Sequence, residues 1–164
     1  MMKKKKVPSS RPVGRGGSTT AFAAITLVLA SLPQALAGQM TVDGFTITNA
    51  WFRAIMPGRP AGGYFTLRND TDIPRKLVGA ASNACGSASL HETREEGGVA
   101  KMVPVDQIDV PAHGSVTFAP GGYHVMCMKP SSAMKPGNTV PLTLKFADGA
   151  DLTTDFTVKS VTGE

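Results

Sequence analysis

Short segments of alternating apolar and polar residues follow one another from residue 45 onward, and turn residues separate them. An alternation with a period of two is typical of strands with one buried face. Eighteen glycines and twelve prolines supply turn residues between the segments. No segment keeps a 3.6-residue apolar period over three turns, so the pattern does not favour long helices. The predicted strands are 45–48, 64–67, 76–80, 87–93, 99–105, 115–118, 123–128, 142–146 and 152–161.

This pattern predicts an all-β domain of eight to ten strands. The expected architecture is an antiparallel β-sandwich or small barrel with Greek-key connections. Residues 57–63, which contain Pro60, are expected to form a loop. Hydrophobic residues make up 41% of the chain and charged residues 18%, as in ordinary globular proteins.

The first 37 residues have the layout of a secretory signal peptide. A basic region precedes an apolar run of twelve residues, 21–32, and Ala35 and Ala37 fit an A-x-A cleavage site. The run is shorter than the roughly 20 apolar residues that a membrane-spanning helix needs. We therefore expect a signal peptide over 1–37 and a periplasmic domain over 38–164, with an uncleaved anchor as the alternative. Gly38, not Cys, follows the predicted cut, so a lipid anchor is not expected.

The net charge of +5 comes from the leader. Residues 1–37 contain six Lys and Arg and no acid, so the rest of the chain has eleven basic and twelve acidic residues. This balance argues against a basic surface for nucleic acid. Two cysteines are too few for a disulfide scaffold or a four-cysteine zinc site.

Two histidines and two methionines form a spaced set of candidate metal ligands: His91, Met102, His124 and Met126. A hairpin centred on residues 96–97 would place His91 directly opposite Met102, with Cβ atoms about 4.5–5.5 Å apart. His124 and Met126 lie two residues apart, so both point to one face of a strand. The two pairs could therefore converge into a set of two nitrogens and two sulfurs.

These ligand types favour Cu(I), because thioethers are soft and neutral. Zinc normally recruits Cys or carboxylate beside His, and calcium and magnesium prefer oxygen. Thioethers bind less strongly than thiolates, which suits a protein that passes copper on. The alternative is that the methionines simply pack in the core. His113, in a predicted turn, is expected to be structural.

The set has the form H-x10-M-x21-H-x-M, which resembles the signature of the periplasmic copper chaperones called the PCuAC family. The resemblance covers roughly residues 41–161. Matching segments include AWFR at 50–53, PG at 57–58, GYFTLRN at 63–69, SLHE at 89–92, KMVPV at 101–105, PGGYHVM at 120–126 and PLTLKF at 141–146.

The resemblance implies a cupredoxin-like β-sandwich that binds Cu(I) through His91, Met102, His124 and Met126. It also implies copper delivery towards the binuclear copper site of cytochrome c oxidase, often alongside thioredoxin-like Sco proteins. Relatives usually carry an apolar residue at the position of Cys127, and some carry Met where this chain has Glu92.

Alternation places Cys127 on the face opposite Met126, towards the core. A buried thiol and a disulfide to Cys85 are both open interpretations, and a thiolate ligand for copper is the least favoured. Met128 shares the face of Met126 and is a further thioether candidate. Met40, Met56 and Met134 are expected to be loop or packing residues.

Two other classes of function compete with a copper chaperone. An electron-transfer cupredoxin needs a Cys thiolate, two His and a weak axial Met, but no His follows Cys127. In a metal-free β-sandwich binding module, the spacing of the quartet, His91, Met102, His124 and Met126, would be a coincidence. The chain is not expected to be an enzyme, because no nucleophile triad, phosphate loop or paired-carboxylate motif stands out.

Overall fold

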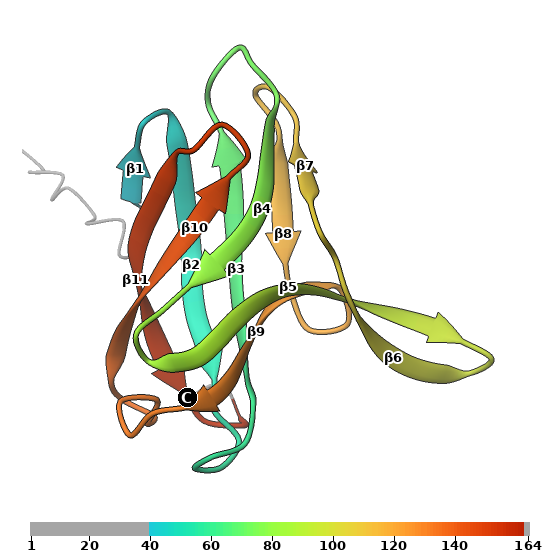
Figure 1. The fold of residues 1–164 in the computed structure, drawn as a ribbon, viewed down its shortest axis with the longest axis vertical. Helices are drawn as coiled ribbons and strands as arrows, with labels where there is room; N and C mark the ends of the chain where they lie inside the picture. The colour runs from blue at the N-terminus through green and yellow to red at the C-terminus, as the bar shows by residue number, and fades with distance from the viewer. Residues whose placement is uncertain (1–39, 163–164) are drawn as a thin grey trace, which may run out of the picture. The chain divides into compact units, whose positions relative to one another are not determined.

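The computed structural model describes residues 40–162. The predicted signal peptide and its cleavage site lie outside this range, so the division at residue 37 stays a prediction. The described part is all-β, as expected (Figure 1). Its strands are β1 (Met40–Val42), β2 (Phe45–Arg53), β3 (Ala61–Asn69), β4 (Arg75–Ala81), β5 (Cys85–Glu96), β6 (Val99–Pro104), β7 (Ile108–Val110), β8 (Ser115–Phe118), β9 (Tyr123–Pro130), β10 (Thr139–Phe146) and β11 (Asp151–Lys159).

The strands form one curled sheet in the order β6-β5-β9-β8-β3-β2-β11-β10-β4-β7, with β1 paired to β2. Neighbours that are distant in sequence give the Greek-key character. Most pairings are antiparallel, as expected, and two are parallel: β2 with β11 and β8 with β9. The three-residue strands β1 and β7 were not predicted, because three residues are too few to show an alternation.

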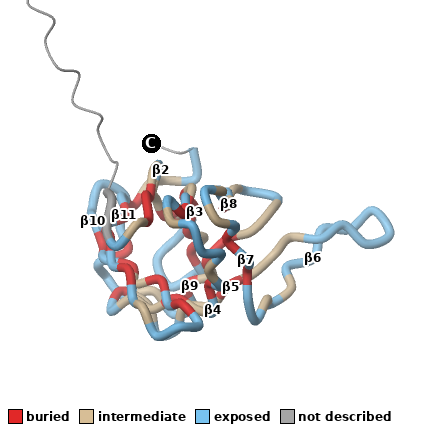
Figure 2. Tube along the Cα trace, turned by 90° about the horizontal axis from the view of Figure 1, so that it is seen from above, coloured by how far each residue is buried: buried red, intermediate tan, exposed pale blue. Residues whose placement is uncertain are grey.

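Alternation along the strands places the core inside the curl of the sheet. In β10 and β11 every second side chain is buried, as the period of two predicts. Phe65 stacks on Phe118 with ring centroids 4.2 Å apart, and Phe52 contacts Phe156 at 5.2 Å. Seen from above, the buried parts of the trace, drawn in red, lie on the strands that enclose the core (Figure 2).

A bulge in β2 decides which residues face outward near the site. The register with β3 shifts between Thr48 and Trp51, where Asn49 adopts a positive φ of 55°. Before the bulge the odd-numbered Ile47 is buried, whereas after it the even-numbered Phe52 is buried. The extra residue therefore turns Trp51 to the outer face of the sheet, where regular alternation would have pointed it into the core.

Residues 61–63 belong to β3 and not to the predicted loop, which closes at Pro60. Ala61 and Gly63 pair with Cys127 and Val125 of β9. The glycine is required by packing, because a Cβ at position 63 would lie 2.7 Å from Cε1 of Phe52. The close approach of the strand to Phe52 requires a glycine. Because glycine is also typical of loops, the sequence predicted a loop here.

We expect Gly63→Ala to lower the free energy of unfolding by about 1–3 kcal/mol, since the added methyl overpacks the fully buried ring of Phe52. Gly79→Ala is the matched control, because its Cβ would meet no atom closer than 3.8 Å. Urea unfolding compares the two variants. Equal midpoints for both would contradict the close packing of β3 on β2.

The outer parts of β5 and β6 form a hairpin, the arm, which projects from the body of the sheet (Figures 1 and 2). Its turn is centred on Gly97 and Gly98, which both adopt positive φ, as a tight two-residue hairpin turn requires. His91 is consequently opposite Pro104, and Met102 is opposite Thr93. The expected direct pairing of His91 with Met102 was wrong by two residues. A shift of two preserves the face, so both side chains still lie on the same side of the arm.

Candidate metal centre

The two candidate histidines lie directly opposite each other on neighbouring strands. His91 of β5 pairs with His124 of β9, and the centroids of their rings are 5.8 Å apart. No local turn links these strands, so the convergence of the two ligand pairs could be expected but not the direct facing of the two histidines. The pairing brings two imidazoles to one point on the outer face of the sheet.

The two candidate methionines lie beside this histidine pair. Met126 pairs with Ser89 on one side and Gly62 on the other, on the same face as His124. Met102 projects from β6 and is 59% exposed. Met102, His124 and Met126 line one cavity of about 500 Å³. The remaining residues that line it are Arg53, Ile55, Met56, Arg59, Pro60, Gly62 and Tyr64.

One ring nitrogen on each histidine is buried without a hydrogen-bond partner. Nδ1 of His124 lies 3.0 Å from the carbonyl oxygen of Gly122, which can only accept, so Nδ1 carries the hydrogen and Nε2 carries a lone pair. That Nε2 has no partner. In His91, Nε2 lies 3.1 Å from Oγ of Ser89 and Nδ1 has no partner. Buried polar atoms of this kind are costly unless a ligand uses them.

The surroundings of His91 favour its neutral form. Burial lowers the pKa of His91 below its usual value of about 6.5, and the adjacent His124 lowers it further. A neutral imidazole is the form that binds a metal ion. Among residues 40–162, no group of three or more His, Cys, Asp or Glu is placed to hold a metal ion.

An array of aromatic and cationic side chains, which the sequence analysis assigned no role, continues from the histidines across the sheet. Tyr64 lies 6.5 Å from His124 and 4.9 Å from Trp51, between ring centroids. Arg53 donates a hydrogen bond of 3.0 Å to the Tyr64 hydroxyl and covers its ring, and Lys159 covers Trp51 at 5.6 Å. These contacts fix Tyr64 as one wall of the cavity. The AWFR and GYFTLRN segments, which contain Trp51, Arg53 and Tyr64, were the sequence signals for them.

Cys85 and Cys127 form a disulfide with Cα atoms 5.4 Å apart, which decides between the two open interpretations. Cys127 is fully buried on the core side of β9, as alternation predicts. The bridge joins β5 to β9, the strands that carry the two histidines. Neither sulfur is a thiolate, so neither is available as a copper ligand.

The third histidine and the remaining methionines of the described residues are not part of the quartet. His113 occupies the turn between β7 and β8, where its ring lies 2.7 Å from Asp72. Met134 is buried packing, as expected. Met128 is exposed on the face of Met126 but does not line the cavity. Met40 begins a strand and not a loop, and Met56 lies in the β2–β3 loop.

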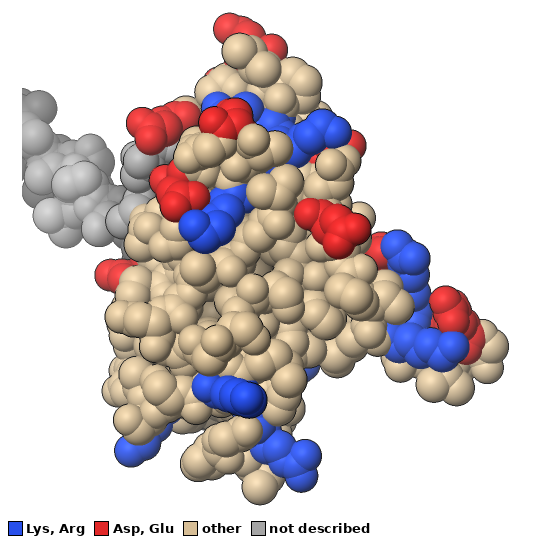
Figure 3. All heavy atoms as spheres, in the orientation of Figure 1, with Lys and Arg blue, Asp and Glu red and all other residues tan. Residues whose placement is uncertain are grey.

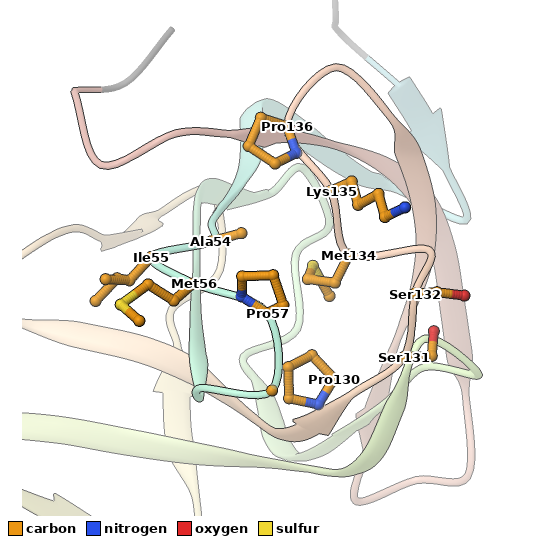
Figure 4. Close-up of a pocket in the computed structure, with 11 residues that line it drawn as sticks. Ala54, Ile55, Met56, Pro57, Pro130, Ser131, Ser132, Met134, Lys135 and Pro136 are labelled. Atoms are coloured by element: carbon orange, nitrogen blue, oxygen red, sulfur yellow. The ribbon is translucent and has the colours of Figure 1, made fainter.

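A second, apolar cavity of about 460 Å³ adjoins the same loop (Figure 4). Figure 4 shows the side chain of Met134 beside Pro57. The side chains of Ile55 and Met56 point away from Met134 in this view. Ile55 and Met56 also line the cavity of Met102, His124 and Met126, so this loop separates the two cavities. The apolar cavity has no histidine or carboxylate among its lining residues.

The fold defines a cupredoxin-like β protein, and sequence comparison assigns it to a family. The chain belongs to the LpqE-like lipoprotein family, whose profile matches residues 45–158. It is 31% identical over 122 residues to the "Putative lipoprotein Lxx21020" of Leifsonia xyli subsp. xyli (strain CTCB07), covering 74% of this chain and 73% of that protein. No helix within residues 40–162 is long and apolar enough to cross a membrane.

Two similar solved structures carry copper in their names and resemble this chain in fold. The solution structure of CuI-DR1885 from Deinococcus radiodurans is 39% identical, with a TM-score of 0.57 over 76% of this chain and 83% of that one. The copper-bound PCuAC domain from PmoF2 is 29% identical, with a TM-score of 0.61 over 74% of this chain and 97% of that one. The resemblance to the PCuAC family is thereby confirmed.

Proposed function

We propose that this protein is a Cu(I)-binding metallochaperone that holds copper through His91, Met102, His124 and Met126. The observation that carries the proposal is the pair of facing imidazoles, each with a buried nitrogen that has no partner. Two thioethers lie on the same face of the sheet. The names of the similar structures, one copper-bound and one Cu(I)-bound, support the same cargo.

The donor set suits a carrier better than a permanent site. Neutral nitrogen and thioether donors match the softness of Cu(I), while the lack of a thiolate keeps the affinity moderate. Half-exposed Met102 leaves one side of the site accessible to another protein's donors. Copper can therefore be passed by ligand exchange, without release of a free ion.

We further propose an extracytoplasmic, periplasmic location for the domain of residues 38–164, after removal of a signal peptide over 1–37. The lipoprotein name of the family and of its Leifsonia member supports a place outside the cytoplasm. As the recipient we propose the copper site of cytochrome c oxidase, reached directly or through a Sco-type protein. This recipient rests on the resemblance to the PCuAC family alone.

An anaerobic Cu(I) competition titration tests the proposed function. Residues 38–164, which contain every described strand, are titrated against a coloured Cu(I) chelator. We expect one tightly bound equivalent per chain. No competition at any ratio would reject a Cu(I) carrier and would favour a metal-free binding module.

The disulfide argues against the electron-transfer alternative. A blue-copper centre needs a Cys thiolate, and both cysteines of the chain are in the bridge. Adding Cu(II) to the oxidised protein should give no intense visible absorption of the thiolate-to-copper type. Such a band would restore the electron-transfer cupredoxin.

Cu(I) affinity should depend on pH through the histidines. Because the pKa of His91 is lowered, protons compete with copper at this residue only below about 6.5. We expect a constant affinity between about pH 7 and 8 and a progressive loss below about pH 6.5. Competition titrations across this range measure the profile, and His113→Ala should reproduce it. A constant affinity down to about pH 4 would show that the histidines do not bind the metal.

A further inference from the structure

The cations of the described residues divide into two groups. Six of them form an ion pair with a carboxylate: Arg68, Arg75, Lys76, Arg94, Lys101 and Lys145. Five form no ion pair within residues 40–162: Arg53, Arg59, Lys129, Lys135 and Lys159. Since the domain as a whole has nearly balanced charge, the second group must create a local positive field.

The five cations without an ion pair lie on segments that meet at one end of the molecule. These segments are the end of β2 and its loop to β3, the ends of β9 and β11, and residues 131–138. They lie at the lower end in Figure 1, and the same end in Figure 3 shows Lys and Arg with no Asp or Glu among them. Residues 51–69, 110–147 and 156–162 contain no acid.

The mouth of the candidate metal centre opens at this basic end. Arg53 and Arg59 line the cavity that Met102, His124 and Met126 share, and no carboxylate lines it. Two exposed apolar side chains line the same cavity as these cations and the donors: Ile55 is 51% and Met56 59% exposed. The face of the arm that carries His91 and Met102 also carries one carboxylate, that of Glu95. It lies two residues beyond Thr93, towards the turn.

We propose that this basic, apolar-centred surface docks an acidic protein that exchanges copper with the quartet. The proposal rests on the proposed function and adds the character of the partner. Ligand exchange requires the partner's donors to reach the mouth at Met102. The partner should therefore carry carboxylates around its own copper ligands, opposite Arg53, Arg59 and the neighbouring lysines, and an apolar contact for Ile55 and Met56.

Three synthetic peptides provide the probe. They share one copper-binding core of His and Met, carry the same copper-quenched fluorophore, and differ only in flanks of four Asp, four Ser or four Lys. Stopped-flow fluorescence measures the rate of Cu(I) transfer from the loaded protein to excess peptide. We expect the Asp-flanked peptide to be faster than the Ser-flanked one by about tenfold or more at low salt, and the Lys-flanked one to be slowest. Salt should remove the difference.

Charge reversal locates the effect on the protein. Arg59→Glu/Lys135→Glu should lower the ratio of the Asp-flanked to the Ser-flanked rate to one or below. A change in copper affinity alone affects both rates equally and leaves this ratio unchanged. Lys76→Glu/Lys145→Glu is the matched control, because it makes the same change in net charge at exposed positions that lie in ion pairs elsewhere. The control should keep the wild-type ratio.

The outcomes separate the two proposals. If the wild-type protein takes up no Cu(I), the proposed function fails. If it takes up Cu(I) but all three peptides react at one rate, the acidic partner is overturned while the chaperone stands. Sedimentation with phosphatidylglycerol vesicles tests whether the basic surface binds anionic lipid in place of a protein. Vesicle binding that is lost in Arg59→Glu/Lys135→Glu, together with charge-independent transfer, would assign the surface to anionic lipid and reject the protein partner.

Discussion

Met102→Leu is expected to weaken Cu(I) binding by at least about tenfold, or about 1.4 kcal/mol. Leucine keeps the apolar volume and removes the thioether, so the loss reports on the sulfur itself. Because Met102 is more than half exposed, the fold should be unaffected. Met128→Leu is the matched control, since this methionine lies on the face of Met126 but does not line the cavity.

His124→Ala should have a larger effect, at least about a hundredfold in the Cu(I) dissociation constant, or about 2.7 kcal/mol. It removes the only imidazole of β9, whose tautomer the carbonyl of Gly122 fixes. His113→Ala is the histidine control and should leave the affinity unchanged. Anaerobic competition titrations measure all four variants, and thermal unfolding checks that the buried His124 can be replaced without loss of the fold. Wild-type affinity in both Met102→Leu and His124→Ala would show that the site is elsewhere.

Loss of the disulfide is expected to lower the free energy of unfolding by about 2–5 kcal/mol. The bridge joins residues 42 apart in the sequence, and a loop of that size corresponds to about 4 kcal/mol of chain entropy. Urea unfolding should therefore show a lower midpoint for Cys85→Ala/Cys127→Ala than for the oxidised protein. The double alanine variant should also bind Cu(I) less tightly, because β5 and β9 are no longer tied beside the histidines.

A reductant provides the control for this prediction. It should lower the midpoint of the wild-type protein and leave the double alanine variant unchanged. Thiol counting on the unfolded, unreduced protein should find no reactive cysteine. Two reactive thiols, or a midpoint that does not respond to reductant, would exclude a stabilising bridge.

The sequence predicted most strands because their alternation is local, and it missed features that depend on distant contacts. It indicated the shared face of His91 and Met102, yet placed the hairpin turn one residue too early. Gly97 and Gly98 both supply positive φ, so they form the turn and shift the pairing by two residues. The facing of His91 and His124 arises between strands that no short turn connects, so no local pattern could predict it.

The composition also could not predict that the five cations without an ion pair gather at one end of the molecule. Net charge averages over the whole domain, whereas the segregation of Arg53 and Arg59 from the carboxylates appears only when loops from several strands meet. The bulge at Asn49 is a further example, because it reverses which residues of β2 face outward. A strict alternation from Ile47 would have buried Trp51.

The arm has a consequence for how quickly copper can leave. Of the four candidate donors, Met102 alone lies on β6, while the other three lie on β5 and β9, which are paired side by side and covalently bridged. If these four donors hold Cu(I) as proposed, an incoming donor would displace Met102 first, while the two imidazoles and the thioether of Met126 would still hold the ion. The lifetime of the loaded protein would then be set by encounters with acceptors and not by spontaneous dissociation.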